Sequence, residues 1–329
     1  MPNFGARIGR QSVDFTVAIP TYNGEQRLPA VLEQLQSQVS NALSWEVLVI
    51  DNNSHDRTAE VVQRFQANFP VPLRYQLEVR QGVGYARQTA IHNAASDLVG
   101  FLDDDNLPDP DWVNAAYQFA QLHPQAGAYG SRIQGEFDAP PPQTLHRVLP
   151  FLAITDRGSK ALKYEPCKKL LPPGAGLVVR RQAWLDSVVP SSLSNLNFRR
   201  SDGNDCSEDL EALLHIQRSN WEIWYNPAMR VRHKIPGWRL ERSYLMPLFR
   251  SIGLSRHATR MLSVPAWKRP LIFWAYLAND LRRIVSHCLK YRTQIKTDLA
   301  AACEMQLFVS SFVSPFYLWK KRYFSKRTI

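Results

Sequence analysis

Short apolar runs alternate with amphipathic stretches through the first part of the chain. The apolar runs predict strands over residues 15–20, 45–50, 73–79 and 98–102, and apolar positions at helical spacing between them predict helices over residues 28–39, 58–69 and 85–95. Strands that alternate with helices are typical of a parallel sheet with crossover helices. We therefore expect an α/β domain.

The pattern changes beyond residue 130, where the regular alternation is lost. Residues 138–142 are rich in proline and predict a loop, residues 176–179 predict a short strand, and residues 206–218 predict a helix. From Trp238 onward the chain is predicted to be helical and basic, with one helical face formed by Leu277, Leu281, Ile284, Val285 and Cys288.

Charge is distributed unevenly along the chain. The net charge is +11, but residues 1–214 have a balance of −5 and residues 215–329 a balance of +16. A basic tail behind an acidic body suggests a polyanionic partner, such as anionic lipid, nucleic acid or a phosphorylated acceptor. We expect an α/β domain over residues 1–237 and a basic amphipathic helical extension, associated with a membrane, over residues 238–329.

Three bulk features bear on the cellular compartment. Residues 1–15 contain no apolar core, so no signal peptide is predicted. The apolar part of the stretch Leu299–Trp319 covers only residues 307–319, which is shorter than the ~20 residues that span a bilayer, so a buried or interfacial helix is expected. The cysteines lack the spacing of metal ligands and are expected to be free thiols in a reducing compartment: Cys167, Cys206, Cys288 and Cys303.

Three successive aspartates follow the predicted strand over residues 98–102. They are Asp103, Asp104 and Asp105, and their carboxylates repel one another unless something neutralises them. Alternate residues of an extended chain point the same way, so Asp103 and Asp105 could share one Mg²⁺ or Mn²⁺ ion while Asp104 turns aside. The alternative is a solvated acidic loop or a helix cap before Pro108.

Other polar clusters also follow predicted strands, at residues 22–24, 51–54 and 80–84. Ligands of parallel sheets bind outside the carboxyl ends of the strands, so these clusters are expected to face one cleft. Asp51 could accept a hydrogen bond from a base or a ribose, or could instead cap a helix at Thr58.

Further along, three features are ambiguous when each is considered alone. The small residues Gly174, Ala175 and Gly176 allow close approach of a ligand to the backbone, or simply lead into a strand. Glu208 and Asp209 begin a predicted helix, where the helix dipole favours acidic residues in any protein. A lone histidine such as His233 is more often a surface or core residue than a ligand.

Together, the clusters resemble the family 2 inverting glycosyltransferases with the GT-A fold. The matching segments are VAIPTYNG (17–24), VLVIDNNSHDRT (47–58), RQGVGYAR (80–87), FLDDDN (101–106), PGAGLVVRR (173–181) and SEDLEALLHIQRSNWEIWYNP (207–227). The resemblance covers about residues 14–235. It implies a Rossmann-like, mostly parallel sheet flanked by helices, which the basic helical extension follows.

The resemblance also implies roles for individual residues. Asp103 and Asp105 match the DXD motif that holds the metal ion, Mg²⁺ or Mn²⁺, and the donor pyrophosphate. Asp209 matches the catalytic base of the ED motif, and His233 lies where some GT-A enzymes place a further metal ligand. The residues implied to bind substrate are Pro20, Tyr22, Asp51, Asn53, Arg80, Arg87, Asp103, Asp104, Gly174, Ala175, Gly176 and Glu208.

The implied activity is transfer of a hexose from a nucleotide sugar to an acceptor hydroxyl. UDP is the first choice of nucleotide, with GDP or dTDP in reserve. The chain has neither a Gln-x-x-Arg-Trp motif after the acidic pair nor a multi-helix membrane domain, so one sugar is expected to be added at a time. The acceptor would be a glycan or a lipid-linked glycan at the inner face of the cell membrane. The proline-rich loop and basic tail also resemble cyanobacterial hormogonium-polysaccharide glycosyltransferases.

Two other classes of function remain open. A nucleotidyltransferase also combines an α/β sheet with acidic metal ligands, but usually has a basic, glycine-rich loop near its first strand, where this chain has Tyr22-Asn23-Gly24-Glu25. A non-catalytic basic protein could bind a membrane or nucleic acid through its tail. That function leaves the acidic clusters without a role, so no nucleic-acid partner is expected.

Overall fold

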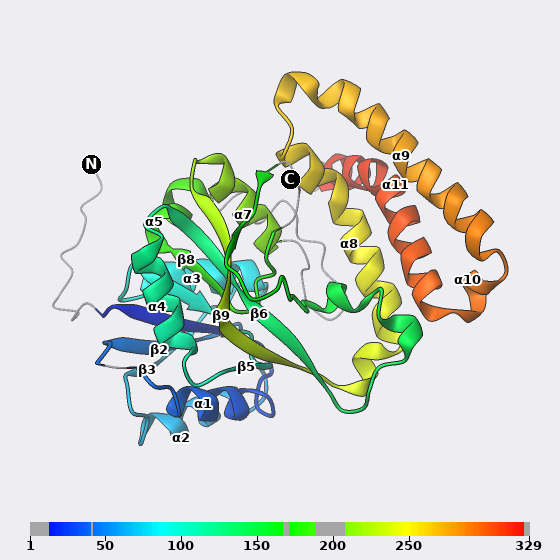
Figure 1. Cartoon of the computed structure of the whole chain (residues 1–329). Helices are drawn as coiled ribbons and strands as arrows, with labels where there is room; N and C mark the ends of the chain where they lie inside the picture. The colour runs from blue at the N-terminus through cyan, green and yellow to red at the C-terminus, as the bar shows by residue number, and fades with distance from the viewer. Residues whose placement is uncertain (1–12, 41, 167–170, 189–207, 326–329) are drawn as a thin grey trace.

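The computed structural model describes residues 13–40, 42–166, 171–188 and 208–325. A nine-stranded sheet forms the centre of the molecule, and the C-terminal helices lie beside it as a separate layer (Figure 1). The strand order is β3-β2-β1-β4-β8-β6-β9-β5, and β7 pairs with β9. The α/β class expected from the sequence is therefore confirmed.

The predicted strands are all present, and four others join them. The predicted ones are β1 (Phe15–Thr21), β2 (Trp45–Asp51), β3 (Leu73–Leu77), β4 (Leu98–Phe101) and β8 (Leu177–Arg180). The strands that the sequence did not predict are β5 (Asn106–Pro108), β6 (Ala126–Phe137), β7 (Leu162–Lys163) and β9 (Glu222–Ile235). The sheet is parallel across β3, β2, β1 and β4 and mixed beyond β4.

Helices cover both faces of the sheet. On one face α1 (Leu28–Gln36), α2 (Thr58–Gln66) and α4 (Trp112–Leu122) pack on inward residues such as Val17 and Val47. On the other face lie α3 (Val83–Asn93), α5 (Arg181–Ser187) and α7 (Glu208–Arg218). Only α4 and α5 were not predicted. The first two residues of the helix predicted over 206–218 lie outside the described residues, as do Cys167 and Cys206.

Strand register brings the polar clusters together. Thr21 of β1 lies opposite Asp51 of β2, so the carboxyl ends of these parallel strands meet at one edge of the sheet. In the mixed half, His233 of β9 pairs with Asn106 of β5, which places the histidine beside the aspartates that follow β4. The long strand β9 thus completes a site that begins at the other end of the chain.

The C-terminal part is helical, as predicted. It consists of η4 (Gly237–Leu240), α8 (Arg242–Leu262), η5 (Ala266–Lys268), α9 (Arg269–Tyr291), α10 (Gln294–Thr297) and α11 (Leu299–Ser325). Leu245 and Phe249 of α8 are buried against Ala300 and Leu307 of α11, together with the free thiol of Cys303, whereas Cys288 is exposed. A short connection, η1 (Gln143–Leu145) and η2 (Leu149–Leu152), contributes to the same core.

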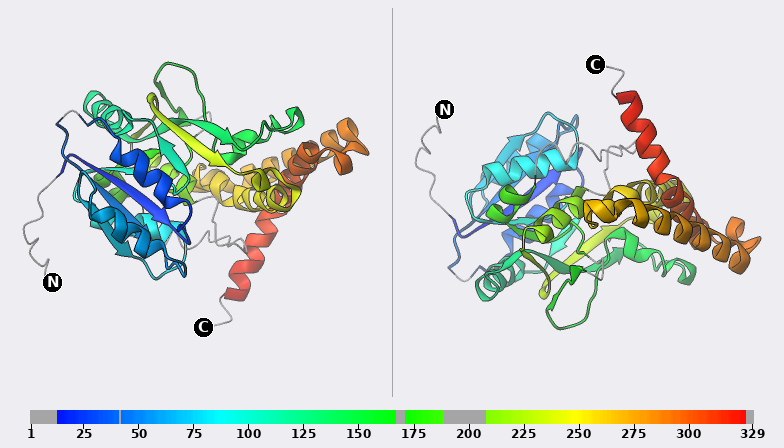
Figure 2. Two further views of the ribbon diagram at one scale, coloured as in Figure 1. Left: turned by 90° about the horizontal axis from the view of Figure 1, so that it is seen from below. Right: turned by 90° about the horizontal axis from the view of Figure 1, so that it is seen from above.

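One described helix has the length and composition of a membrane span. It is the Leu299–Lys320 segment of α11, and 44% of its apolar 18-residue window, with a mean hydropathy of 1.3, is buried inside the protein. The buried residues extend from Ala300 to Ser314, where α11 packs on α8, and the end of α11 projects away from the rest of the molecule (Figure 2).

Candidate active site

A cavity of about 970 Å³ opens at the carboxyl ends of β1 and β4. Residues that follow β1 and β4 line it together with α3, α7 and the segment after β9. The predicted site residues that line the cavity are Pro20, Tyr22, Arg87, Asp103, Asp104, Asp105, Asp209 and His233. The fold therefore gathers eight residues that are scattered along the sequence.

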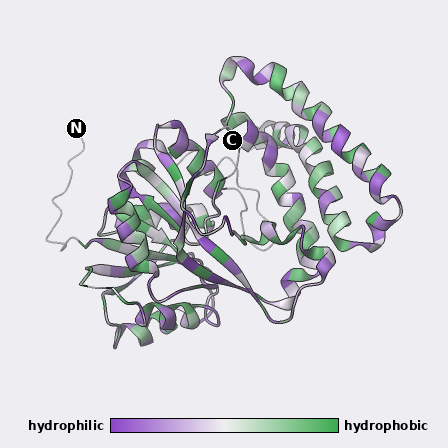
Figure 3. Ribbon diagram, viewed as in Figure 1, coloured by the Kyte–Doolittle hydropathy of each residue, from purple (hydrophilic) through white to green (hydrophobic). Residues whose placement is uncertain are grey.

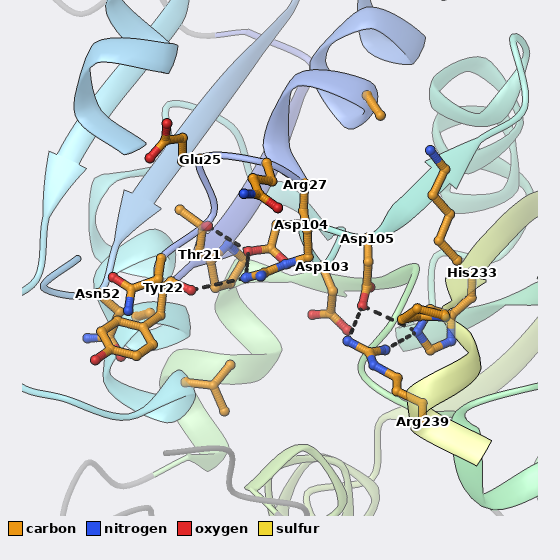
Figure 4. Close-up of a pocket in the computed structure, with 18 of the residues that line it drawn as sticks. Thr21, Tyr22, Glu25, Arg27, Asn52, Asp103, Asp104, Asp105, His233 and Arg239 are labelled. Carbon is orange, nitrogen blue, oxygen red and sulfur yellow. Dashed lines mark hydrogen bonds and ion pairs between the residues drawn. The ribbon is translucent and has the colours of Figure 1, made fainter. Parts of the chain in front are cut away.

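Asp104 turns away from its two neighbours, as expected, but residues 103–106 form a hydrogen-bonded turn and not the extended chain on which that expectation was based. Its carboxylate accepts hydrogen bonds from Thr21 Oγ1 at 2.6 Å and from Arg27 Nε and Nη2, both at 2.9 Å (Figure 4). Arg27 also donates to the Tyr22 carbonyl at 3.0 Å. Asp104 thus fixes the turn after β1, and the Tyr22 carbonyl with it.

Asp105 is buried, and two basic side chains face it. Arg239 Nη2 lies 2.8 Å from Asp105 Oδ2, and His233 Nε2 lies 3.5 Å from the same oxygen. Burial alone would raise the pKa of Asp105, but the charge of Arg239 and its hydrogen bond to the carboxylate lower the pKa below its usual value. Asp105 is therefore an anion at any physiological pH.

The contacts of His233 fix its tautomer. Its Nδ1 lies 3.1 Å from the Leu152 carbonyl, which can only accept, so Nδ1 carries the proton. Its Nε2 then accepts a hydrogen bond from Arg239 Nη1 at 3.1 Å. The Nε2 lone pair and the Asp105 carboxylate consequently point at one position, which the Arg239 guanidinium fills (Figure 4).

Asp103 faces the cavity from the opposite side of the aspartate triplet. Its side chain is 39% exposed, and Arg87 Nη2 donates to its Oδ1 at 3.2 Å. Removal from bulk water raises the pKa of Asp103, and the charges of Asp105 and Asp104 add to this, while Arg87 opposes it. A cation in the cavity would relieve that repulsion.

Arg87 also forms an ion pair with Asp209, and so connects the candidate base to the aspartate triplet. The guanidinium is almost fully buried, whereas the Asp209 side chain is 28% exposed toward the cavity. Gly174 packs directly against this pair, since a Cβ atom at Gly174 would collide with the Asp209 carboxylate and lie 2.6 Å from Arg87 Nη2. Gly174, which was predicted to allow close approach of a ligand, thus lies against the candidate base in this structure.

Other predicted site residues do not line the cavity. Asp51 is buried and accepts hydrogen bonds from Tyr75 Oη at 2.7 Å and from the Ser54 backbone at 2.8 Å. Arg80 pairs with Glu78 at 2.8 Å and stacks over Tyr85. Their proposed contacts with nucleotide stay predictions, as do those of the remaining residues outside the cavity, Asn53, Gly174, Ala175, Gly176 and Glu208.

Several cavity residues were missed from the sequence, among them Arg27, Asn52, Trp238, Arg239 and Tyr244. Asn52 could have been found, because it adjoins Asp51. Its side chain donates to the Arg80 carbonyl at 2.7 Å and accepts from the Gly82 backbone at 2.7 Å, which joins β2 to the turn before α3. The residues of η4 and α8 carry no motif that would assign them to the site.

The donor set suits a divalent cation that is only partly held by protein. Among the described residues, no three His, Cys, Asp or Glu side chains form a complete set of metal ligands. Asp105 and the His233 lone pair nevertheless converge on one position, with Asp103 close by in the same cavity. Mg²⁺ and Mn²⁺ typically take one or two carboxylates and complete their coordination with water and substrate phosphates.

Comparisons with known proteins identify the class. The mannosyltransferase PcManGT from Pyrobaculum calidifontis, solved with GDP-Man and Mn²⁺, has a TM-score of 0.54 at 17% identity over 92% of this chain and 87% of that one. S. aureus TarS 1-349 with UDP-GlcNAc has a TM-score of 0.51 at 16% identity over 91% of each chain. The fold is therefore that of the GT-A glycosyltransferases.

The family follows from the sequence comparison. Residues 16–183 match glycosyl transferase family 2, and the chain belongs to this family. It is 25% identical to the glucosyl-dolichyl phosphate glucuronosyltransferase of Haloferax volcanii over 75% of this chain and 77% of that protein. It is 37% identical to the uncharacterized glycosyltransferase YfnE of Bacillus subtilis over 30% of this chain, but this match spans only 24% of that relative's length.

Proposed function

We propose that the chain transfers one sugar from a nucleotide sugar to an acceptor hydroxyl, with inversion at the anomeric carbon. The observation that carries this proposal is the arrangement of two acidic groups in one cavity. Asp103, Asp105 and Asp209 all line this cavity, and the buried guanidinium of Arg87 joins Asp103 to Asp209. This arrangement suits a donor bound between a diphosphate site and a general base.

For the donor, UDP is preferred and GDP or dTDP is the reserve. The turn after β1 presents Tyr22, whose ring contacts His55 edge-on with centroids 6.4 Å apart. Tyr22 and Asn52 line the end of the cavity that would take the base. TarS with UDP-GlcNAc and PcManGT with GDP-Man support a nucleotide-sugar donor, and each supports a different base.

Asp103, Asp105 and His233 would hold a Mg²⁺ or Mn²⁺ ion. Such an ion supplies Lewis-acid stabilisation of the diphosphate leaving group. PcManGT was solved with Mn²⁺, which supports the assignment. Arg27 and Arg239 line the same cavity and place further positive charge near the diphosphate.

Asp209 is proposed as the general base. The acceptor oxygen attacks the anomeric carbon as the bond from that carbon to the diphosphate oxygen breaks, and the hydroxyl proton passes to the Asp209 carboxylate. Attack opposite the leaving group inverts the configuration, so an α-linked donor gives a β-linked product. The ion pair with Arg87 orients the carboxylate. A positioned base typically contributes ~10²–10⁴ to the rate.

The acceptor is proposed to be a glycan or lipid-linked glycan at the cytoplasmic face of a membrane. One side of α9 is apolar and at least half exposed, through Leu271, Trp274, Leu281, Val285 and Leu289. Hydrophobic and hydrophilic positions alternate along this outer helix (Figure 3). Exposed apolar residues among lysines and arginines are typical of a helix that lies on an anionic lipid surface.

The experiment that tests the function is a donor screen followed by product analysis. Nucleoside diphosphates are titrated with Mn²⁺ by calorimetry, and the corresponding nucleotide sugars are then assayed for transfer. UDP is expected to bind more tightly than ~1 mM, or roughly −4 kcal/mol. Pyrophosphate release from a nucleoside triphosphate would indicate a nucleotidyltransferase. If no nucleotide binds, the chain is a non-catalytic basic protein.

A further inference from the structure

A second cavity, of about 500 Å³, lies between α7, α8 and α9. Its lining residues all differ from those of the first cavity, at the carboxyl ends of β1 and β4, which is proposed to bind the nucleotide. The two cavities nevertheless share a helix, because Leu210 of α7 lines the second one and directly follows the candidate base Asp209. The proposed transfer reaction gives this second cavity no role.

Three arginines line one side of this cavity, namely Arg256 and Arg260 of α8 and Arg283 of α9. Asp280, which is buried, forms hydrogen bonds of 2.5 and 2.9 Å with both terminal nitrogens of Arg260. Within the described part of the chain, Arg256 has no hydrogen-bond or ion-pair partner. The three arginines therefore share a single nearby carboxylate, that of Asp280, which is already paired with Arg260.

The lowered pKa of Arg256 is consistent with a binding site for an anion. Burial, together with the charges of Arg260 and Arg283, lowers the pKa of Arg256 to about 10. A bound dianion would reverse the repulsion among the three side chains. The planar guanidinium group matches the oxygen spacing of a phosphate and can donate to two oxygens at once.

Apolar side chains also line the cavity and form an apolar wall. They are Leu171, Leu210, Leu214 and Ile252, together with Pro166. A soluble inorganic anion would leave this wall in contact with water, whereas an apolar chain attached to the anion would cover it. The cavity therefore combines two surfaces that an amphiphile would satisfy together.

We propose that this cavity binds a phosphate group that carries an apolar chain. Arg256 and Arg283 contact the phosphate, and the leucine-lined wall covers the first part of the chain. The cavity-lining residues of α9, Tyr276, Asn279 and Arg283, lie on the side opposite its exposed apolar face. A membrane lipid is the source of such a ligand, and in this respect the inference rests on the proposed membrane association.

The test is calorimetric binding of three probes to the full chain, each below its critical micelle concentration. Decyl phosphate has both features of the ligand, inorganic phosphate has only the anion, and decyl maltoside has only the chain. We expect decyl phosphate to bind at least about tenfold more tightly than inorganic phosphate, as the burial of several methylene groups predicts. Decyl maltoside should show no saturable binding. Equal affinity for both phosphates would overturn the amphiphile assignment.

Variants locate the site. Arg256→Gln should weaken decyl phosphate binding by about tenfold, the effect of one lost charge-assisted hydrogen bond, and Arg283→Gln, at an exposed position, should do the same if the Arg256 variant folds poorly. Arg250→Gln on the exposed side of α8 is the matched control and should bind within about twofold of wild type. An equal loss in Arg250→Gln would mean that binding follows net charge and would overturn the proposal.

A parallel titration with UDP and Mn²⁺ separates the two proposals. Because the cavities share no lining residue, Arg256→Gln should keep the wild-type affinity for UDP. A protein that binds UDP but not decyl phosphate overturns this inference alone. One that binds decyl phosphate but no nucleotide overturns the proposed transferase function alone.

Discussion

Arg239 Nη2 lies 2.8 Å from Asp105 Oδ2, so a cation of the protein itself occupies the position where Asp105 and His233 would meet a metal ion. Arg239 belongs to η4, at the start of the C-terminal helical part. The guanidinium and a divalent ion cannot share this position. Binding of the proposed ion would therefore require Arg239 to move, and this would link the proposed metal site to η4, the segment before α8.

The first prediction follows from this competition. Arg239→Gln should raise the affinity for Mn²⁺ in the absence of nucleotide by at least about threefold, because the variant removes a positive charge next to the ligands. Electron paramagnetic resonance titration of free Mn²⁺ measures this directly. Arg242→Gln, exposed at the first turn of α8, changes the net charge equally and should leave the affinity unchanged. Weaker Mn²⁺ binding in Arg239→Gln would show that the guanidinium supports the ion.

The second prediction concerns the membrane. Replacing both Trp274 and Leu281 of α9 with alanine should reduce binding to vesicles that contain anionic lipid by at least about tenfold, since each exposed apolar side chain gains ~1.5–3 kcal/mol on burial. Liposome flotation measures the bound fraction. Leu122→Ala removes an exposed leucine of α4 in the α/β domain and serves as the control. Equal, salt-insensitive binding of the wild type to neutral and anionic vesicles would contradict the electrostatic contribution.

Third, the Glu78–Arg80 pair should give stability a defined pH dependence. The Glu78 carboxylate accepts hydrogen bonds from Arg80 and from Thr89, and these lower its pKa from 4.5 to about 2. A depressed carboxyl pKa contributes stability above pH 4.5 that is lost as the pH falls toward 2. Glu78→Gln should therefore lower the free energy of unfolding by about 1–2 kcal/mol at neutral pH. This range allows for solvent screening of the exposed Arg80. The difference between variant and wild type should shrink below pH 4.5. Denaturant unfolding across pH 3–7 tests this, with the exposed Glu60→Gln as control.

The first half of the fold could be predicted from the sequence because β1 and β2 are buried on both faces, and they appear as mostly apolar runs. The strands β6 and β9 could not be recognised in this way. β6 contains Gly127, Gly130 and Gly135, and β9 contains Pro227, so both lack the composition of ordinary strands. Their pairing with each other stabilises them, and a contact between segments far apart in the sequence leaves no local signal.

The residues of the candidate site could be predicted from the sequence where they adjoin a recognisable strand or helix, and not elsewhere. The aspartates after β4 and the acidic start of α7 lie at the ends of recognisable elements, which made their position at the cavity foreseeable. Arg239 and Arg27 act through contacts that exist only in the folded chain, with Asp105 and Asp104 respectively. The sequence also could not show that Arg80 pairs with Glu78. A turn whose arginine is held by a neighbouring carboxylate has the same amino-acid composition as a turn whose arginine is available to a ligand.

Gly174 supports the fourth prediction. A methyl group at this position would collide with the Asp209 carboxylate and displace it from Arg87. Gly174→Ala should therefore lower kcat by at least about tenfold while the donor KM changes little, because positioning of a general base matters in the transition state. Gly237→Ala is the control, as nothing lies within 4 Å of its added methyl group. A normal kcat in Gly174→Ala would mean that the carboxylate does not need its present position.

The last prediction separates two neighbouring carboxylates, Glu208 and Asp209. Adjacent helical residues point about 100° apart, so one of them at most can face the reacting hydroxyl. Glu208 is buried beneath the cavity, where a Cβ atom on Gly84 would collide with its carboxylate, whereas the Asp209 side chain is 28% exposed and lines the cavity. We therefore expect Asp209 to accept the proton.

Removal of a base lowers turnover far more than it weakens donor binding, because the base acts in the transition state. Asp209→Asn should keep the affinities for UDP and Mn²⁺ within a few fold and lose at least ~10²-fold in transfer, since asparagine preserves the shape of the side chain but cannot take the proton. Glu208→Gln should be milder. Single-turnover assays beside calorimetry separate the two effects. An active Asp209→Asn beside an inactive Glu208→Gln would reverse the assignment, and activity in both variants would place the base outside α7.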